Sequence, residues 1–403
     1  MTTERRYFTL SNHIKPVSQP ARRKRGRARW VLLTAAVLLA LLLIAWLLFP
    51  KELNPDRVVR FFRYMGLRDK AGYGRISFEG GAGNTYAGFD DGLLVGTESG
   101  LTLYSLEGEQ KAFVQGSLPN PVLRAGGDVS LIFSPGSSYA AAVGSGGAVL
   151  MDGALSGSFI NADVSADSFT AYLTSESGCK AVATVLNPKL EPIYRFSSRT
   201  RYLNACAVSE KGSWLAVASL EEQDSVYRSG LTLLRTDEPL EDLAQEDSSA
   251  IRVELGNQLV YELRFLDRSH LMALCQDELL FFNTEGEELA ALSLRDEQLV
   301  DYSVSEQGWL VLALSRSGGE SRVLTLNAQG QQLAETSLPE RVSSVSAAGN
   351  YAAVLTEAYV QTYDRRLKPY DRSWDTLGIT RVIARSDGTA LLLGSSGTKL
   401  FIP

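Results

Sequence analysis

The sequence predicts an all-β protein: a β-propeller in which eight blades are favoured and seven remain possible, preceded by an N-terminal transmembrane helix. Three observations lead to this prediction. Residues 30–49 form an uncharged apolar run. Short apolar runs then recur from residue 93 to the end of the chain at a mean interval of about 42 residues, and helical periodicity is absent from residue 71 onward.

The first 29 residues form a basic tail, with nine Lys or Arg and a single acid, Glu4. Cations beside a first apolar span are retained on the cytoplasmic side, so we expect the tail inside the cell and the C-terminal domain outside. The residues that carry this topology signal are Arg22, Arg23, Lys24, Arg25, Arg27 and Arg29. Clustered cations can also bind phosphates. Their position beside a membrane span favours contact with lipid headgroups, and we expect no nucleic-acid partner.

Residues 30–49 are long enough to cross a bilayer, because twenty helical residues rise roughly 30 Å. The run contains nine leucines and no charge, and its anchoring residues at the two interfaces are Trp30, Trp46 and Phe49. A cleavable signal peptide would have a shorter apolar region that ends in small residues. We therefore predict an uncleaved signal anchor and a single-pass protein of the cell membrane.

Residues 50–70 are predicted to link this span to the extracytoplasmic domain. A helix should begin at Pro55, which follows Asn54 at the N-cap position, and should end at Gly66. Apolar and basic residues alternate at helical spacing, so the helix can rest on the outer leaflet or dock on its own domain.

Residues 71–403 are predicted to form the propeller. Each repeat has one strongest apolar run, preceded in most cases by a polar turn, and we refer to these eight runs as anchor strands. They occupy residues 93–96, 140–143, 171–174, 215–218, 271–274, 310–313, 352–355 and 390–393. One such unit cannot bury both of its faces alone, so the units must stack around a ring. Seven blades remain possible because only 31 residues separate the second and third anchor strands.

The ring is predicted to close with a strand from the N-terminal side. The last repeat ends at Pro403 without a fourth strand, while residues 73–78 precede the first anchor strand without a repeat of their own. We expect residues 73–78 to complete the last blade.

Few residues suited to catalysis are present. The two histidines, His13 and His270, lie on opposite sides of the predicted span, and three cysteines cannot all pair. His270 is expected to be a turn residue, and the cysteines small buried side chains. We predict no catalytic residues, no metal site and no cofactor. A carboxylate pair in the central channel would still suffice for glycan hydrolysis or cleavage by a lyase, which is the alternative to a binding function.

The propeller is acidic, with 25 bases and 42 acids in residues 71–403. Its longest interval between anchor strands contains an insertion with six acids and no base, which we call the acidic loop: Asp237, Glu238, Glu241, Asp242, Glu246 and Asp247. Insertions on repeat scaffolds commonly carry binding specificity. We predict that this loop contacts a protein partner with a basic face.

The order of parts resembles a known family. A basic tail, a single span, the helix opening at residues 54–57 and the motifs at residues 72–74, 88–95 and 103–108 are similar to a Firmicutes family of single-pass, propeller-like proteins catalogued as a domain of unknown function. The resemblance implies a Gram-positive cell surface and supplies no catalytic residue.

We therefore predict a membrane-anchored, extracytoplasmic module with a WD40-like propeller that binds or scaffolds a protein of the cell envelope. A sensor that relays ligand binding through the span is a further alternative, although the tail of 29 residues holds no signalling domain.

Overall fold

The computed structural model describes residues 37, 55–67, 73–223, 226–237, 250–316 and 318–403. The chain divides into two compact units, Met1–Arg63 and Tyr64–Pro403, and every strand among the described residues lies in the second. Among the described residues, no helix combines the length and apolar character needed to cross a membrane. Apart from Val37, the predicted span lies outside the described residues.

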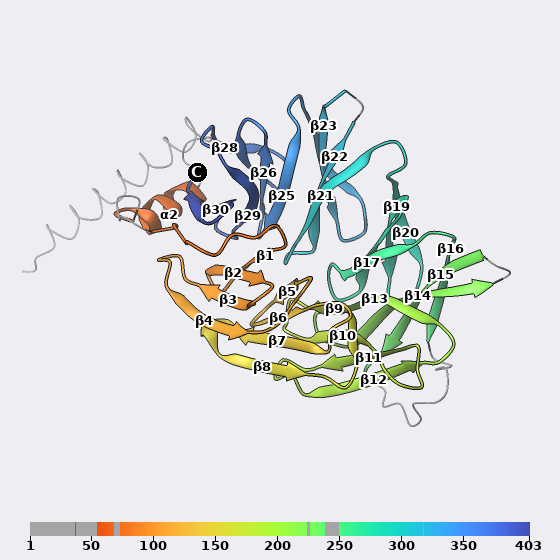
Figure 1. Cartoon of the computed structure of the whole chain (residues 1–403). Helices are drawn as coiled ribbons and strands as arrows, with labels where there is room; N and C mark the ends of the chain where they lie inside the picture. Colours follow the sequence, from red (N-terminus) through yellow and green to blue (C-terminus); the bar gives the residue numbers. More distant parts are fainter. Residues whose placement is uncertain (1–36, 38–54, 68–72, 224–225, 238–249, 317) are drawn as a thin grey trace, which may run out of the picture. The chain divides into compact units, whose positions relative to one another are not determined.

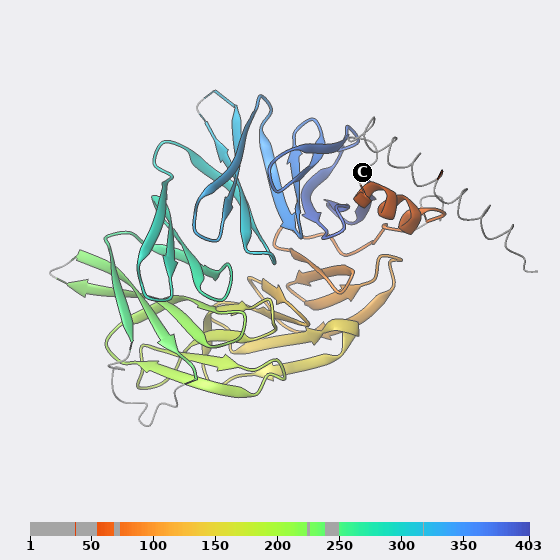
Figure 2. The ribbon, with the colours of Figure 1, turned by 180° about the vertical axis from the view of Figure 1, so that it is seen from behind.

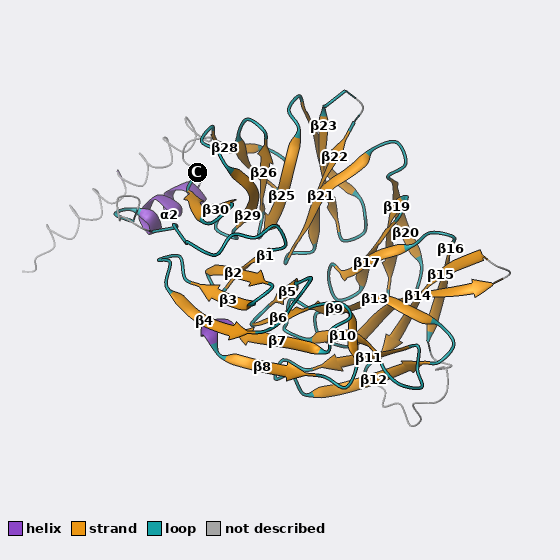
Figure 3. Ribbon diagram, viewed as in Figure 1, coloured by secondary structure: helices purple, strands orange, loops and turns teal. Residues whose placement is uncertain are grey.

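Strands dominate the described chain (Figure 3). The exceptions are helix α2 (Pro55–Tyr64), which begins at the predicted proline, and a short 3-10 helix, η1 (Ser145–Gly147). Val59 and Phe62 of α2 and the following Met65 are exposed.

The strands form eight antiparallel sheets, which we call blades 1–8. Blade 1 contains β1 (Thr85–Phe89), β2 (Gly92–Thr97), β3 (Gly100–Tyr104) and β4 (Gln110–Gln115). Blade 2 contains β5 (Val122–Gly126), β6 (Val129–Phe133), β7 (Tyr139–Gly144) and β8 (Val149–Ala154). Blade 3 contains β9 (Ser158–Val164), β10 (Thr170–Ser175), β11 (Ala181–Leu186) and β12 (Pro192–Ser198). Blade 4 contains β13 (Tyr202–Val208), β14 (Trp214–Gln223), β15 (Val226–Arg235) and β16 (Ile251–Gly256).

The remaining blades follow the same order. Blade 5 contains β17 (Val260–Phe265), β18 (His270–Cys275), β19 (Glu278–Asn283) and β20 (Glu288–Ser293). Blade 6 contains β21 (Gln298–Ser305), β22 (Trp309–Ser315), β23 (Ser321–Asn327) and β24 (Gln332–Leu338). Blade 7 contains β25 (Val342–Ala348), β26 (Tyr351–Thr356), β27 (Val360–Asp364) and β28 (Pro369–Ser373). Blade 8 contains β29 (Ile379–Ala384), β30 (Ala390–Gly394) and β31 (Thr398–Phe401).

The blades follow one another around a common centre, in chain order (Figure 1). The first strand of a blade is innermost, and except between blades 5 and 6 it neighbours the first strand of the next blade, as β9 does with β13 and β25 with β29. Seen from behind, the blades keep the same order (Figure 2). The fold is therefore an eight-bladed β-propeller, and the eight-blade prediction is confirmed.

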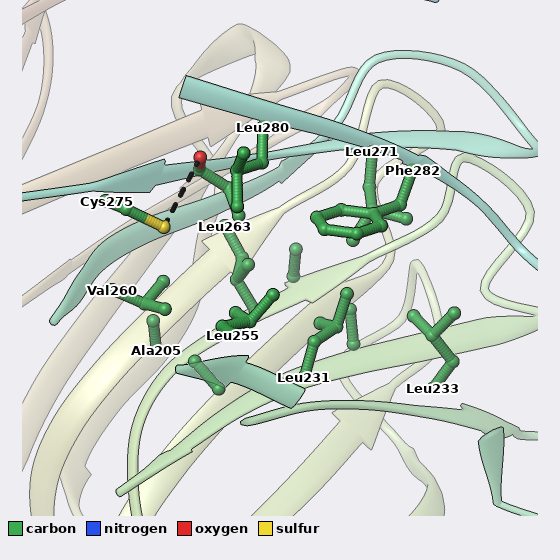
Figure 4. Packing of buried hydrophobic residues seen from close by; sticks show 14 residues of the cluster. Ala205, Leu231, Leu233, Leu255, Val260, Leu263, Leu271, Cys275, Leu280 and Phe282 are labelled. Atoms are coloured by element: carbon green, nitrogen blue, oxygen red, sulfur yellow. Dashed lines mark hydrogen bonds between the residues drawn. The ribbon is translucent and has the colours of Figure 1, made fainter. Parts of the chain in front are cut away.

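The core lies between the blades. Eight buried apolar clusters are present, and each joins two consecutive blades. Figure 4 shows the cluster between blades 4 and 5, where Leu231 and Leu233 of blade 4 face Leu263, Leu271 and Phe282 of blade 5. Burial of each such side chain stabilises the fold by roughly 1.5–3 kcal/mol, so the ring depends on every interface.

The eighth cluster closes the ring as predicted. Ile76 and Phe78 are buried in it between Leu391 of blade 8 and Leu93 of blade 1. Thr398 of β31 donates its backbone N–H to the carbonyl of Ile76 at 2.8 Å, and Ser77 forms an antiparallel bridge with Gly397. Residues 74–78, which we call the closing strand, thus lie along the outer edge of β31 in the place of a fourth strand, and an isolated bridge joins them to the three-stranded sheet of blade 8.

Gly74 shows how closely this segment approaches blade 8. Its φ is +71°, and a Cβ atom there would lie 2.2 Å from Cβ of Leu400. Only glycine combines this conformation with so close an approach.

One anchor strand was assigned to the wrong place in its blade. Residues 140–143 lie in β7, the third strand of blade 2, whereas every other anchor strand lies in a second strand. The second strand of blade 2 is β6, which begins at Val129. Both strands are almost wholly buried, so apolar content alone could not separate them. With β6 in its place the short interval disappears, and with it the reason for considering seven blades.

The two sides of the ring differ in their loops. Each innermost strand is followed by a turn into the second strand, and we call the side that holds these turns the turn face. The opposite side, where the innermost strands begin, is the start face.

Tyr64 lies at the turn face, because its hydroxyl donates to Asp387 at 2.5 Å and accepts from Arg385 at 3.0 Å, and both partners belong to the turn after β29. Burial and the Asp387 carboxylate raise the pKa of Tyr64 to about 12.

Candidate functional site

The innermost strands of blades 3–8 share a β-bulge near their beginning. In each of them one residue is left without a partner in the second strand, and blades 1 and 2 lack this bulge. The unpaired residues are Ile160, Asn204, Tyr261, Val300, Ser343 and Thr380. A bulge re-aims the side chains that follow it. Two residues of each strand then reach toward the neighbouring blade: the one directly after the unpaired residue, and the one two positions further along the strand.

Side chains at these two positions join the innermost strands of neighbouring blades. In blade 6, Asp301 accepts the backbone N–H of Val345 at 2.8 Å, and Ser303 accepts that of Ala347 at 3.0 Å. Asn161 and Asp163 of blade 3 bind blade 4 in this way, and Ser344 and Ser346 of blade 7 bind blade 8. The side chains therefore supply hydrogen bonds that the separated strands cannot make directly.

Blades 4, 5 and 8 depart from this pattern, and blade 8 carries Arg381 and Ile383 at the two positions. Blade 4 carries Ala205 and Ala207 at the two positions, and neither side chain can accept a hydrogen bond. Blade 5 carries Glu262 and Arg264 there. Arg264 passes over the small residues of blade 4 and binds Asp163 of blade 3, with 2.7 Å between Nη1 and Oδ1.

Five side chains from blades 2, 3, 5 and 6 meet at this point, and we call them the central charge cluster: Arg124, Asp163, Glu262, Arg264 and Tyr302. Nε of Arg264 lies 2.9 Å from Oε1 of Glu262, and Nη2 of Arg124 lies 3.5 Å from the same oxygen. The hydroxyl of Tyr302 donates to the other oxygen of Glu262. Asp163 is buried, and the other four are partly exposed.

The two carboxylates of the cluster are shifted in opposite directions. Burial raises the pKa of Asp163 above its usual range, even though Arg264 opposes the shift. Burial would also raise the pKa of Glu262, but Arg264, Arg124 and the Tyr302 hydrogen bond outweigh it and lower the value to about 2. Glu262 is therefore ionised at neutral pH, and its charge is balanced by the two arginines.

The ring's own donors occupy all four carboxylate oxygens of this cluster. Asp163 accepts from Arg264 through one oxygen and from the backbone N–H of Val208 through the other. Glu262 accepts from arginines through one oxygen and from Tyr302 through the other. A glycosidase needs one free carboxyl group as acid and another as base or nucleophile. The arrangement is better suited to holding four blades together.

His270 is the first residue of β18, directly after the turn in which it was expected. Its Nδ1 contacts the Asp267 carboxylate at 2.8 Å and the Ser269 hydroxyl at 3.4 Å. A catalytic triad needs the acid and the nucleophile on opposite ring nitrogens, whereas both groups here contact one nitrogen. The contacts fix the turn.

The three cysteines are unpaired. Cys206 and Cys275 are buried, and Cys179 is half-buried. Burial raises the pKa of the Cys206 thiol well above its usual range, as it does that of Cys275, so neither is an activated nucleophile.

Only one residue of the acidic loop is described. Asp237 is half-exposed and binds Arg235, with Nη2 at 2.6 Å and Nε at 3.0 Å from its carboxylate oxygens. The hydrogen bond from Arg235 lowers the pKa of Asp237. β15 ends at Arg235 opposite Trp214, the first residue of β14, so the loop leaves the propeller on its turn face. Outside the described residues lie Glu238, Glu241, Asp242, Glu246 and Asp247.

The predicted membrane residues also lie outside the described residues. They are the interface residues Trp30, Trp46 and Phe49 and the topology signal Arg22, Arg23, Lys24, Arg25, Arg27 and Arg29. Their roles stay predictions.

Comparison with known proteins gives a family and a fold. No curated protein matches the chain significantly. Among solved structures, the C-terminal WD40 domain of Sif2 is 11% identical, with a TM-score of 0.53, over 81% of this chain and 97% of that one. The β-propeller domain of Myceliophteria thermophila Cps50 (Swd1) is 11% identical, with a TM-score of 0.47, over 70% of this chain and 96% of that one. The likeness to the Sif2 domain supports the propeller fold alone.

The model of a family of unknown function matches residues 72–369. This range begins just before the closing strand and ends in blade 7, and it covers more than half of the chain. The chain therefore belongs to the family of unknown function DUF5711.

Proposed function

We propose that this protein is a membrane-anchored, extracytoplasmic propeller that acts as a binding or scaffolding module in the cell envelope. The observation that carries the proposal is the closed ring of eight blades, whose central carboxylates are already bound by the ring's own arginines and hydroxyl. Because these carboxylates are already bound, the two faces of the propeller are better suited to binding partners than its centre is to acting on a substrate.

The membrane anchor is proposed from the sequence. Twenty uncharged residues follow nine cations, a pattern typical of a span whose N-terminus stays in the cytoplasm. A protease added to intact, wall-stripped cells should degrade residues 51–403 and leave the tail. A protected propeller would refute the orientation and the extracytoplasmic location together.

A non-enzymatic role without cofactor is proposed from the site. The net acidic charge of the propeller favours a protein partner with a basic face. Crosslinking in the native cell, followed by copurification from detergent extracts and mass spectrometry, tests this directly. A partner that is recovered only with the intact propeller supports the proposal.

Glycan hydrolysis remains a second candidate because of one observation. Asp163 and Glu262 both bind Arg264, and their pKa values are shifted in opposite directions, as in pairs of carboxyl groups that act as acid and base. If this function holds, Asp163→Asn and Glu262→Gln should each abolish turnover of cell-wall glycan by the wild-type protein. A wild-type protein without turnover would remove the candidate.

A further inference from the structure

The start face of blade 7 carries an exposed tryptophan and an exposed leucine on one ordered loop. We infer that this loop binds a chain of N-acetylhexosamine sugars, with the indole ring of Trp374 stacked on one sugar ring. The inference deepens the proposed binding function, on which it rests for its place in the envelope, and gives that function a surface and a class of ligand. We call the surface the tryptophan ridge: Tyr359, Arg372, Trp374, Asp375 and Leu377.

The first observation is the exposure of two large side chains. Residues 374–378 connect β28, the outermost strand of blade 7, to β29, the innermost strand of blade 8 (Figure 1). Trp374 is 65% exposed and Leu377 is 97% exposed, which are the two highest values among the large apolar side chains that the structure describes. Exposed apolar groups that are rimmed by polar residues mark sites of interaction.

The second observation is that the loop holds these side chains in fixed positions. Ile379 donates its backbone N–H to the carbonyl of Thr376 at 3.0 Å, and Gly378 has a φ of +75°. These features define a tight turn with Leu377 at its tip. The hydroxyl of Thr376 donates to the carbonyl of Ala358 at 3.5 Å, which ties the loop to the connection between β26 and β27. Because the loop is already ordered, little conformational entropy is lost when a ligand binds.

The third observation is the support beneath Trp374. Its ring centre lies 5.3 Å from that of Tyr359 at an interplanar angle of 71°, which is an edge-to-face arrangement. Tyr359 is buried, and its hydroxyl donates to Glu340 at 3.1 Å. The guanidinium carbon of Arg372 lies 3.8 Å from the ring centre of Tyr359 and 5.3 Å from that of Trp374. These contacts fix the orientation of the indole ring and leave most of its surface free.

The polar groups around the indole ring leave both donors and acceptors free. Nε of Arg372 donates to Gln361 at 2.7 Å, and its two terminal nitrogens bind no carboxylate in the part of the chain that the structure describes. One oxygen of Asp375 accepts from Lys399, and the Asp375 side chain is 68% exposed. A sugar hydroxyl both donates and accepts, so a sugar can bind the arginine and the aspartate together.

The size of the ridge favours a sugar over a protein. A stable protein interface buries about 800 Å² on each partner. Among the described residues of blades 6–8, the next most exposed large apolar side chain after Trp374 and Leu377 is Leu333, at 38%. Two side chains on one loop are too few for a protein interface. Their Cα atoms are three residues apart and therefore at most roughly 11 Å from each other, which is the span of about two linked sugar rings.

The chemistry of the ridge fits a neutral, N-acetylated sugar. A β-linked pyranose whose substituents are all equatorial exposes C–H groups on both faces, and such a face can stack on an indole ring. The hydroxyls of the sugar would bind Arg372 and Asp375, and the methyl of an acetamido group would pack on Leu377. A neutral sugar also avoids repulsion by the propeller, which has 42 acids and 25 bases.

Calorimetric titration of the full-length protein, in a detergent without a sugar headgroup, tests the inference. The probe is the hexasaccharide of β-linked N-acetylglucosamine. The wild type should bind it, and Trp374→Ala should bind it about tenfold more weakly, because the stacked ring is lost. Trp374→Phe keeps an aromatic ring and should retain most of the affinity. A wild type that releases no heat of binding, or a Trp374→Ala variant of equal affinity, would overturn the inference.

The matched control is Tyr227→Ala, which removes an aromatic side chain that is 60% exposed on blade 4. This control should bind the hexasaccharide as the wild type does, and equal weakening in Tyr227→Ala and Trp374→Ala would overturn the ridge.

A further variant, Leu377→Ala, tests the contact with the acetamido group. Its side chain is 97% exposed, so the variant should melt at the temperature of the wild type. We expect it to bind the N-acetylglucosamine hexasaccharide more weakly than the wild type does. The corresponding glucose hexasaccharide lacks the acetamido methyl, so it should bind the wild type more weakly and should be insensitive to Leu377→Ala. Equal effects on the two sugars would overturn the role of the acetamido group.

Two other outcomes would assign the ridge a different ligand. Tighter binding of polygalacturonate than of the hexasaccharide would overturn the neutral sugar in favour of an anionic glycan. A photoreactive amino acid at position 377 that crosslinks to a protein in cells, together with no binding of the hexasaccharide, would overturn the glycan in favour of a protein. Because the titration uses purified protein, its failure is distinguishable from failure of the protease and copurification tests of the proposed function.

Discussion

Truncation of the closing strand should weaken the whole ring. Ile76 and Phe78 are 1% and 8% exposed, and both lie in the cluster that joins blade 8 to blade 1. Replacing a buried Ile by Ala costs about 2–5 kcal/mol and a buried Phe about 3–5 kcal/mol, so Ile76→Ala and Phe78→Ala together should remove about 5–10 kcal/mol. That loss is comparable with the whole stability of a typical domain, about 5–15 kcal/mol.

Urea-induced unfolding followed by tryptophan fluorescence measures this effect. The controls are Ile193→Ala and Phe113→Ala, which remove the same side chains from the outer strands β12 and β4, where they are 44% and 46% exposed. We expect each single variant of the closing strand to unfold at a clearly lower urea concentration than its control, and the double variant to aggregate. Equal midpoints in the matched pairs would show that residues 74–78 do not hold the ring closed.

Three further predictions concern the cluster and the loop. Arg264→Met should lower the free energy of unfolding in urea by about 3 kcal/mol, because it leaves two carboxylates without their shared cation. Adding Asp163→Asn should recover part of this loss. If the losses of the two single variants simply add in the double variant, the pairing is contradicted. Glu262 has its pKa lowered from 4.5 to about 2, so it contributes stability above pH 4.5 that is lost as the pH falls toward 2. Melting temperatures measured across this range should fall less steeply for Glu262→Gln than for the wild type, and parallel curves would refute the shift. Replacing the six acids of the acidic loop by Ser or Asn should lower recovery of a basic partner at low salt without changing the melting temperature, and unchanged recovery would remove the loop from the interface.

The sequence was sufficient to favour eight blades over seven and to predict the way the ring closes. A repeat with a buried second strand leaves an apolar run at a regular interval, and a missing outer strand can be noticed by comparing the two ends of the chain. It was not sufficient to place every strand within its blade. In blade 2 the second and third strands are both almost wholly buried, so only the pairing of β6 with the innermost strand β5, and of β7 with the outer strand β8, shows that β6 lies further in.

The central charge cluster could not be predicted. Its members come from four innermost strands, and the contact between Arg264 and Asp163 joins residues 101 positions apart. The bulges also shift the alternation of side chains by one residue, so the spacing along a strand does not say which side chains face the centre. Glu262 and Arg264, two positions apart in blade 5, were the only local signal, and such a pair is common on exposed strands.

The closing strand has a mechanical consequence under the proposed N-terminal anchor. Residues 74–78 run antiparallel to β31, and Tyr64 precedes them at the turn face, held by Arg385 and Asp387. Tension applied from the N-terminal side would first load the hydrogen bonds of Tyr64. It would then pull the closing strand along its own length, so that its bonds to blade 8 resist in shear, all at once, instead of opening one by one. Under such a pull, the contacts of the closing strand with blade 8 would carry the load before the rest of the ring.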